Sequence, residues 1–190
     1  STEAGLRMEE FMQLENSSDM AVTSDIEDES GRPIVMEVFL PQGLENLSIS
    51  TFFNEQALVV TEEGFYDTMA VPPGKHIAVF SYSLPITSES VEITKNISLP
   101  TDNIVIFSRL NRAEIEGLGQ PKQTTLKDGA AVDYYSLKDL ETAQAISFKI
   151  KGLNVGASDN SIFAVMAILG VVLAVLVVRR VASSSNENNR

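Results

Sequence analysis

The chain has one histidine, His76, and this residue is the first to test for chemistry. A histidine can act as a general base or as a metal ligand near neutral pH. It follows a Pro-Pro-Gly turn and opens the apolar pattern "KHIAVF", and no serine lies in a G-x-S-x-G nucleophile motif. A Ser-His-Asp triad assembled in space stays an alternative, but the pattern favours an ordinary histidine at the start of a strand.

Methionines and carboxylates are two further kinds of metal ligand in this chain. Methionines can bind copper together with histidine, but here they form no tight M-x-M or H-x-M cluster, which favours core packing. An acidic run offers oxygen ligands for calcium, but an EF-hand loop counted from Asp25 would place Ser30 at the glycine position and Met36 at the glutamate position. A solvated loop is therefore favoured. The residues are Met8, Met12, Met20, Met36 and Met69, and Asp25, Glu27, Asp28 and Glu29.

The composition excludes several other classes of protein. There is no cysteine, which rules out disulfides, thiolate metal sites and a cysteine nucleophile. Gly117 and Gly119 lack the third glycine and the following helix pattern of a dinucleotide-binding motif. Residues 1–160 hold 25 acidic and 11 basic residues, a net charge of −14, which disfavours binding to nucleic-acid phosphates. We predict no catalytic residue, no cofactor, no metal site and no enzyme activity.

The body of the chain has the pattern of an all-β protein. Apolar residues alternate with a period of two, valine, isoleucine and aromatic residues are frequent, and turn residues such as "PQG", "EEG" and "PPG" separate the runs. Short strands at this spacing predict an antiparallel β-sandwich. The expected strands cover residues 34–40, 46–51, 56–61, 65–71, 75–84, 89–99, 103–110 and 145–153.

The residues between 38 and 85 also carry a resemblance. The segments "VFLPQGLENLSIS" and "TEEGFYDTMAVPPGKHIAVFSYSLP" resemble a poorly characterised group of membrane-anchored bacterial β-sandwich proteins. Those proteins are similar to carboxypeptidase regulatory-like and other transthyretin-like modules. The likeness continues through "YYSLKDLETAQAISFKIKGL" and implies an anchored sandwich that faces out of the cell. It carries no catalytic residues to this chain.

A long apolar run near the C-terminus predicts a membrane anchor. Ile162 to Val178 contains no charge and no polar face, and a helix of this length rises about 26 Å, the short end of what crosses a bilayer. The run includes Phe163 and a small-xxx-small pair, Gly170 and Ala174, which permits close helix approach, although ordinary small residues facing lipid are favoured.

Two arginines set the orientation of this span. Arg179 and Arg180 follow it directly, and the positive flank of a span normally stays in the cytoplasm. We therefore expect an extracytoplasmic N-terminus and a cytoplasmic tail in the cell (plasma or inner) membrane. The chain begins with Ser1, so we expect a processed chain without its secretory signal, although an artificial start would look the same.

The expected organisation follows from these patterns. "MEEFMQLENSSDMAV" can form a hairpin about a polar turn, and no internal repeat is strong enough to predict two domains. Three sequons, at Asn16, Asn46 and Asn96, permit glycosylation, but their number is close to chance. The predicted parts are an N-terminal hairpin and acidic arm (1–30), a β-sandwich ectodomain (31–153), a linker (154–161), a transmembrane helix (162–178) and a cytoplasmic tail (179–190).

Two functions fit a chain whose strongest signals are an anchor and a scaffold. The first is a non-catalytic accessory or structural subunit of a larger membrane complex, respiratory or of the envelope, whose partners are the lipid bilayer and other membrane subunits. The alternative is a stand-alone surface module that binds carbohydrate, metal or a periplasmic client protein. An exposed strand edge suits either function, because it can pair with a partner chain.

Overall fold

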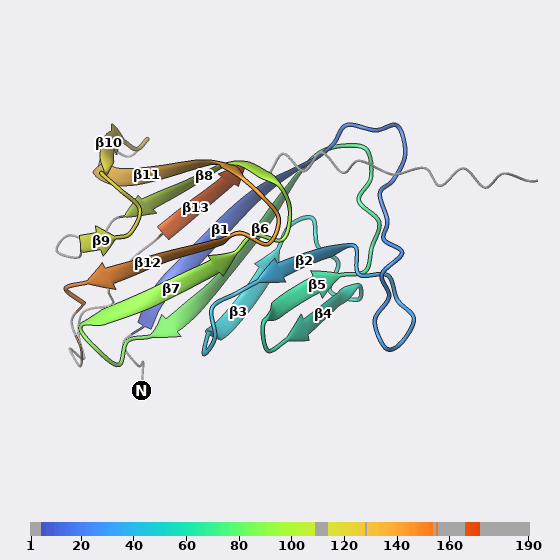
Figure 1. The fold of residues 1–190 in the computed structure, drawn as a ribbon, viewed down its shortest axis with the longest axis horizontal. Coiled ribbons are helices and arrows are strands. Elements are labelled where there is room, and N and C mark those ends of the chain that lie inside the picture. The colour runs from blue at the N-terminus through green and yellow to red at the C-terminus, as the bar shows by residue number, and fades with distance from the viewer. Residues whose placement is uncertain (1–4, 109–113, 128, 154, 156–165, 172–190) are drawn as a thin grey trace, which may run out of the picture.

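The chain folds as an all-β structure, as its alternating pattern predicts (Figure 1). The computed structural model describes residues 5–108, 114–127, 129–153, 155 and 166–171. Within these residues there are thirteen strands and no helix. Each of the eight strand runs expected from the sequence coincides with or overlaps one of the observed strands.

The strands form two layers (Figure 1). One layer is a seven-stranded sheet, and the other consists of two three-stranded sheets. All pairs are antiparallel except β1 with β13. The large sheet has the order β10 (Lys122–Thr125), β11 (Ala131–Leu140), β8 (Thr101–Ser108), β13 (Met166–Val171), β1 (Gly5–Asn16), β6 (Gly74–Pro85), β3 (Glu45–Ser50); the small sheets are β7 (Ser90–Asn96), β12 (Ala145–Lys151), β9 (Glu114–Glu116) and β2 (Met36–Phe39), β5 (Gly64–Asp67), β4 (Leu58–Thr61).

The strand pairing repeats after six strands. In the first half β1 and β3 pair with β6, and β2 and β4 pair with β5. Adding six to each number gives the pairs of the second half, in which β7 and β9 pair with β12, and β8 and β10 pair with β11. Residues 5–85 and 90–151 are therefore two halves with one topology, which the sequence alone does not reveal.

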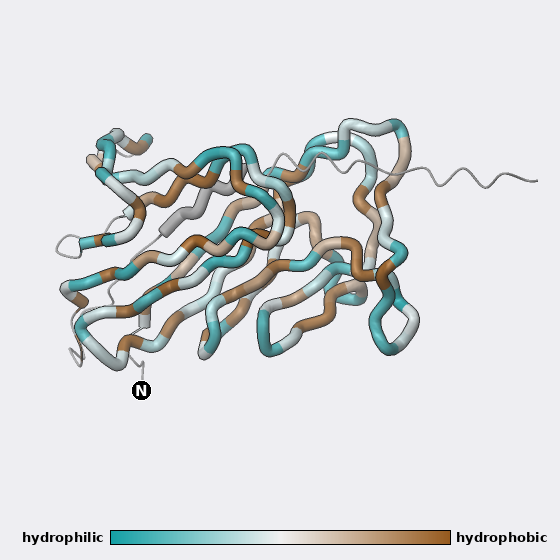
Figure 2. The backbone as a smooth tube through the Cα atoms, viewed as in Figure 1, coloured by the Kyte–Doolittle hydropathy of each residue, from teal (hydrophilic) through white to brown (hydrophobic). Residues whose placement is uncertain are grey.

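The two halves share one hydrophobic core. Inward side chains alternate along β6 and β12 because successive residues of a strand point to opposite faces. Phe65 on β5 stands edge-on to Phe80 on β6, with ring centroids 5.3 Å apart, so the aromatic contact joins the two layers. Figure 2 shows the corresponding contrast along the chain, with hydrophobic stretches on strands and hydrophilic ones at most turns. The inward residues of these two strands are Ala78, Phe80, Tyr82, Leu84, Ile146, Phe148 and Ile150.

The N-terminal strand differs from the expected hairpin. β1 pairs along its whole length with β6, so it lies inside the large sheet and not in a hairpin with the residues that follow it. Of those following residues, Val22 forms only an isolated bridge with Val71. The physical reason is length: a twelve-residue strand with an apolar face completes a full ladder against β6, whereas a local hairpin would leave most of that face exposed.

The apolar C-terminal run contributes β13 to the large sheet. Met166–Val171 pairs parallel with β1 and antiparallel with β8, where the sequence predicts part of a helix. The flanking parts of the predicted span, 162–165 and 172–178, lie outside the described residues, and so does the predicted tail. Among the described residues no helix is long and apolar enough to cross a membrane. The span itself stays a prediction.

Candidate functional site

β2 and β7 are two strand edges that meet in the layer of small sheets. Within the described residues β2 is hydrogen-bonded only to β5 and β7 only to β12, so one side of each backbone lies outside any ladder. The two strands run in opposite directions (Figure 1). We call the space between them the seam, bounded by Met36–Phe39 and Ser90–Asn96. A side chain crosses it, since the Lys95 ammonium donates a hydrogen bond to the Phe39 carbonyl oxygen at 3.1 Å.

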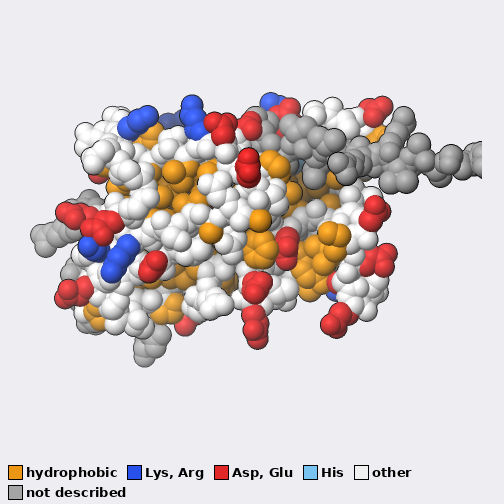
Figure 3. Space-filling view, in the orientation of Figure 1, with side chains coloured by type: hydrophobic (Ala, Val, Ile, Leu, Met, Phe, Trp, Pro, Cys, Tyr) orange, Lys and Arg blue, Asp and Glu red, His pale blue; other side chains and the backbone are white. Residues whose placement is uncertain are grey.

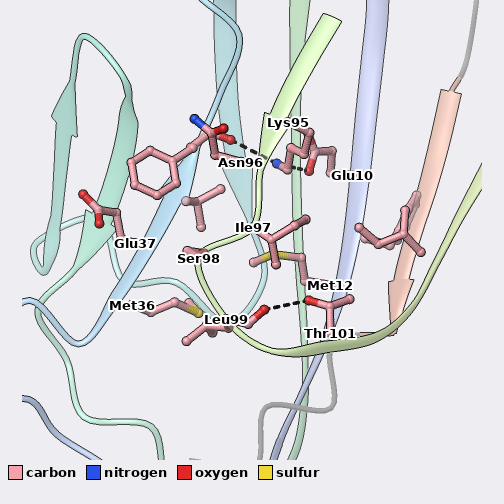
Figure 4. A pocket seen from close by; sticks show the side chains of 14 residues that line it. Glu10, Met12, Met36, Glu37, Lys95, Asn96, Ile97, Ser98, Leu99 and Thr101 are labelled. Atoms are coloured by element: carbon pink, nitrogen blue, oxygen red, sulfur yellow. Dashed lines mark hydrogen bonds and ion pairs between the residues drawn. The ribbon is translucent and has the colours of Figure 1, made fainter. Parts of the chain in front are cut away.

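A buried ion pair forms the floor of the seam (Figure 4). Glu10 on β1 is 1% exposed, and its carboxylate lies 2.7 Å from the Lys95 ammonium. The Tyr82 hydroxyl on β6 donates to the other carboxylate oxygen at 2.9 Å. Glu10 and Tyr82 belong to the large sheet and Lys95 to the facing layer, so the cluster links the two layers. Burial of such charges is tolerable only when each is paired and hydrogen-bonded.

Burial also affects the pKa of the tyrosine in this cluster. Burial raises the pKa of the Tyr82 hydroxyl far above its usual range, and the Glu10 charge and the hydrogen bond to it raise that pKa further. Tyr82 is therefore a neutral donor at physiological pH. The Lys95 ammonium also lies 5.6 Å from the centroid of the Phe80 ring, at cation–π distance. With a carboxylate, a carbonyl and a ring around it, this lysine is held in place and is not a free nucleophile.

The end of the seam toward Leu99 is apolar and leaves little free volume. A cavity of about 40 Å³ lies there, with room for two or three water molecules. Met12, Met36, Ile97 and Leu99 surround it, and the sticks of Figure 4 show the two thioether side chains beside Ile97 and Leu99. A hollow of this size with this lining suits a side chain or a few waters, and it is too small for a drug-sized ligand.

The other end of the seam opens into a polar groove of about 590 Å³. The loop after β2, at Pro41–Gly43, forms one wall, and the exposed residues of β7 form the other. Two exposed carboxylates, Glu63 and Glu92, line it. Figure 3 shows acidic side chains next to hydrophobic ones along the middle of this face. The groove is therefore open and carries negative charge at its rim.

His76 lies near the start of β6, as the sequence predicts. Its Nε2 atom lies 2.9 Å from the Pro72 carbonyl oxygen, and its ring packs against Phe52 with centroids 5.0 Å apart. Both contacts hold the turn before the strand. Within the described part of the chain, no group of three or more histidine, aspartate or glutamate side chains is close enough to share a metal ion.

The methionines divide between the core and the surface. Met8 and Met36 are buried, and Met12 packs against the core from the large sheet. Met20 and Met69 are exposed. Met12 and Met36 come together only in the apolar cavity of the seam, where their neighbours are aliphatic.

The acidic run forms a tight turn around Asp28. Its carboxylate accepts hydrogen bonds from the backbone amides of Ser30 and Arg32, from the Arg32 guanidinium and from the Tyr66 hydroxyl. These donors, above all the Arg32 amide, lower the pKa of Asp28 to about 2. The hydrogen bond to Asp28 and burial in turn raise the pKa of Tyr66, with burial the larger cause. Protein donors thus occupy the carboxylate that a calcium site would need.

The anchor and sequon residues have separate outcomes. Gly170 lies in β13, opposite Met12 of β1 and Ile104 of β8, whereas Ile162, Phe163, Ala174, Val178, Arg179 and Arg180 lie outside the described residues. Asn16 is buried, and its amide donates to the carbonyl oxygens of Met20 and Val71. Glycosylation of Asn16 is incompatible with this packing. Asn46 and Asn96 are exposed.

Sequence reasoning missed the charged cluster of the seam, although a signal was present. Along β1 the inward positions are Met8, Glu10 and Met12, so a carboxylate stands on an otherwise apolar face. Along β7 the inward position after Ile93 is Lys95. Opposite charges on the apolar faces of two strands indicate a buried pair, because neither is stable there alone.

No protein-family model matches this chain, and no curated protein matches it. The resemblance to transthyretin-like modules therefore remains a prediction. The strand pairs, the seam and its charged floor are what the structure itself provides for an argument about function.

Proposed function

We propose that this protein is a non-catalytic, single-pass membrane-anchored accessory or structural subunit of a larger membrane complex, to which it contributes an extracytoplasmic β-sandwich. The observation that carries the proposal is the uncharged run 162–178, followed at once by Arg179 and Arg180 and preceded by an all-β head. A span with that flank places the head outside the cytoplasm. The respiratory or envelope setting is part of the same proposal.

The proposed span and β13 use the same residues. Met166–Val171 cannot pair with β1 and β8 and also form part of a membrane-spanning helix at the same time. In the anchored state these residues leave the large sheet, and the facing edges of β1 and β8 lose their ladder. An unpaired edge is a template for a strand of another chain, which suits a subunit that works by contact with partners.

The seam favours a protein partner over a small ligand. Its apolar cavity is too small for a drug-sized molecule, whereas its open groove lies between β7 and the end of β2 with the loop that follows it. An open site beside a strand edge suits an extended polypeptide. This arrangement also supports one form of the second candidate, a surface module that binds a client protein.

Anchoring can be tested with a charge placed in the middle of the run. The protein should stay in the membrane fraction through an alkaline carbonate wash. An arginine near the centre of a span makes the free energy of membrane insertion less favourable by about 3 kcal/mol. For so short a run, this is a large share of the favourable insertion free energy. We therefore expect Gly170→Arg to release the chain into the supernatant and the matched variant Gly170→Leu to stay. Retention of both variants, or release of the unmodified chain, contradicts the anchor.

The accessory role has a separate test. Extraction of the native membrane with a mild detergent, followed by size separation, should bring out the chain in a stable assembly with other membrane proteins. A monodisperse monomer from that extraction contradicts the subunit proposal, and saturable binding of a soluble client protein to that monomer supports the surface module instead.

A further inference from the structure

The two halves of the sandwich meet at two equivalent junctions. In the large sheet, strand one of the first half (β1) and strand two of the second half (β8) lie on either side of β13. In the other layer, strand one of the second half (β7) neighbours strand two of the first half (β2) across the seam. The same two strand positions therefore face each other twice, with the halves exchanged.

The junction in the large sheet holds a complete strand. β13 pairs with β1 from Met8 to Gln13 and with β8 from Asn103 to Ile106, so an extended segment fits between these strand positions and bonds to both. The seam has the same pair of edges without a strand between them among the described residues. The Lys95 side chain reaches one edge carbonyl, and the remainder is the cavity and the groove.

We propose that the seam binds an extended segment of a partner protein, which adds as a strand between β2 and β7. This inference rests on the proposed function only in taking the ligand to be a protein. Backbone hydrogen bonds to the free edges would supply affinity, and alternate side chains of the segment would enter the seam. The contact between Lys95 and the Phe39 carbonyl is the bond that an incoming backbone N–H replaces, while Lys95 keeps its bond to Glu10.

The lining of the seam defines the chemistry of that segment. The end surrounded by Met36, Ile97 and Leu99 accepts an aliphatic side chain. Glu63 and Glu92 are the charged residues that line the groove end, and Lys149, opposite Glu92 on β12, is not part of this lining, so the groove end favours lysine or arginine. The segment is therefore extended, aliphatic at one end and basic at the other.

The test uses the full chain in detergent micelles and a fluorescent decapeptide of alternating valine and threonine that ends in two arginines. We expect saturable binding by fluorescence anisotropy with a Kd in the micromolar range. The same peptide with two glutamates should bind at least about tenfold more weakly, a difference of about 1.4 kcal/mol. A peptide with N-methyl groups on alternate amides should not bind, because it cannot form the ladder.

Variants of the protein locate the site. Glu92→Lys and Glu63→Lys should each weaken binding of the arginine peptide about tenfold. Glu55→Lys, an exposed change of equal charge that does not line the groove, should leave binding unchanged. Because the peptide should pair with both β2 and β7, its presence should also slow amide hydrogen exchange in both strands.

Three results overturn the inference. They are equal binding of the N-methylated peptide, absence of saturable binding at peptide concentrations up to about 1 mM, and equal effects of Glu92→Lys and Glu55→Lys. Self-association of the chain that the peptide reverses would replace the partner by a second copy. None of these results depends on the detergent extraction that tests the accessory role. Strand addition can therefore be wrong while the accessory role is right, and the accessory role can be wrong while strand addition is right.

Discussion

The two junctions between the halves of this sandwich contain equivalent strands and are closed in different ways. Between β1 and β8 the closure is a backbone ladder supplied by β13. Between β2 and β7 it is a lysine side chain, anchored on a carboxylate that lies almost entirely out of water. The first junction buries backbone groups in regular pairs, and the second leaves strand edges beside a cavity and a groove.

The two halves share one strand topology, but the two junctions between them differ in the groups that close them. Two copies of one six-strand arrangement give two equivalent junctions, of which β13 fills one, while a lysine side chain bridges the other. The buried pair of Glu10 and Lys95 links the layers at the seam and uses one edge group, the Phe39 carbonyl oxygen. At the seam, the buried ion pair therefore stabilises the contact between the layers, while most backbone groups on the facing edges of β2 and β7 lie outside any ladder.

The largest expected effect comes from removing the lysine that bridges the seam. Lys95→Met leaves Glu10 buried without a counter-charge, which we expect to lower the free energy of unfolding by about 3 to 5 kcal/mol. Adding Glu10→Gln should recover much of this loss, because a neutral amide still accepts from Tyr82. Chemical denaturation of the full chain in detergent measures both. The control is Lys151→Met, which removes an ion pair with Glu116 that is exposed on both sides and should change stability by less than about 1 kcal/mol.

A smaller loss of unfolding free energy is expected from a steric clash between β5 and β2. Gly64 has φ +143°, and a Cβ there would overlap the Val38 carbonyl, so Gly64→Ala must shift β2. We expect a loss of about 2 to 3 kcal/mol in unfolding free energy, together with faster amide exchange in β2 than in β7. Gly43→Ala is the matched control, since Gly43 also has a positive φ but open space around its Cβ position. Equal losses of unfolding free energy in the two variants would contradict the close contact between Gly64 and the Val38 carbonyl.

The smallest expected effect is a pH dependence confined to the β2 side of the seam. The pKa of Asp28 is lowered from 3.8 to about 2, so its stabilising contribution is complete above about pH 5 and is lost progressively as the pH falls through 2. Because Asp28 holds Tyr66 of β5, acid should loosen the sheet of β2, β5 and β4 before that of β7 and β12.

Denaturation midpoints between pH 5 and pH 2 measure this effect. Asp28→Asn should flatten the acid side of the profile, and Asp25→Asn, an exposed change in the same run, should leave it as in the unmodified protein. If the profile of Asp28→Asn is the same as that of the unmodified protein, the turn around Asp28 does not contribute to the acid stability of this sheet.

Sequence patterns predicted most of the strands because their inward residues alternate without interruption, as in β6 and β12. They missed β11, whose buried residues Val132, Tyr135 and Leu140 are spaced by three and five. Part of the cause lies in the backbone: Asp139 has φ +54° and is left out of the ladder with β8, and Leu140 after it is buried although Lys138 before it is exposed. β9 and β10 are too short and polar to give a periodic signal.

Long-range pairing and the candidate site were harder to predict than the strands. β1 belongs with β6, some seventy residues later, and nothing local distinguishes that partner from a nearby one. The seam arises only when β2 and β7 are brought together. Its charged floor left a trace, because Glu10 and Lys95 interrupt apolar faces, but their pairing requires the fold.

Protease treatment of right-side-out membrane vesicles tests the central claim most directly. Epitopes placed before Gly5 and after Arg190 report the fate of the head and of the tail. A single span with arginines on its inner flank predicts that external protease removes the head epitope while the tail epitope survives until detergent is added. Survival of the head with loss of the tail, or loss of both without detergent, contradicts an extracytoplasmic sandwich on a membrane anchor.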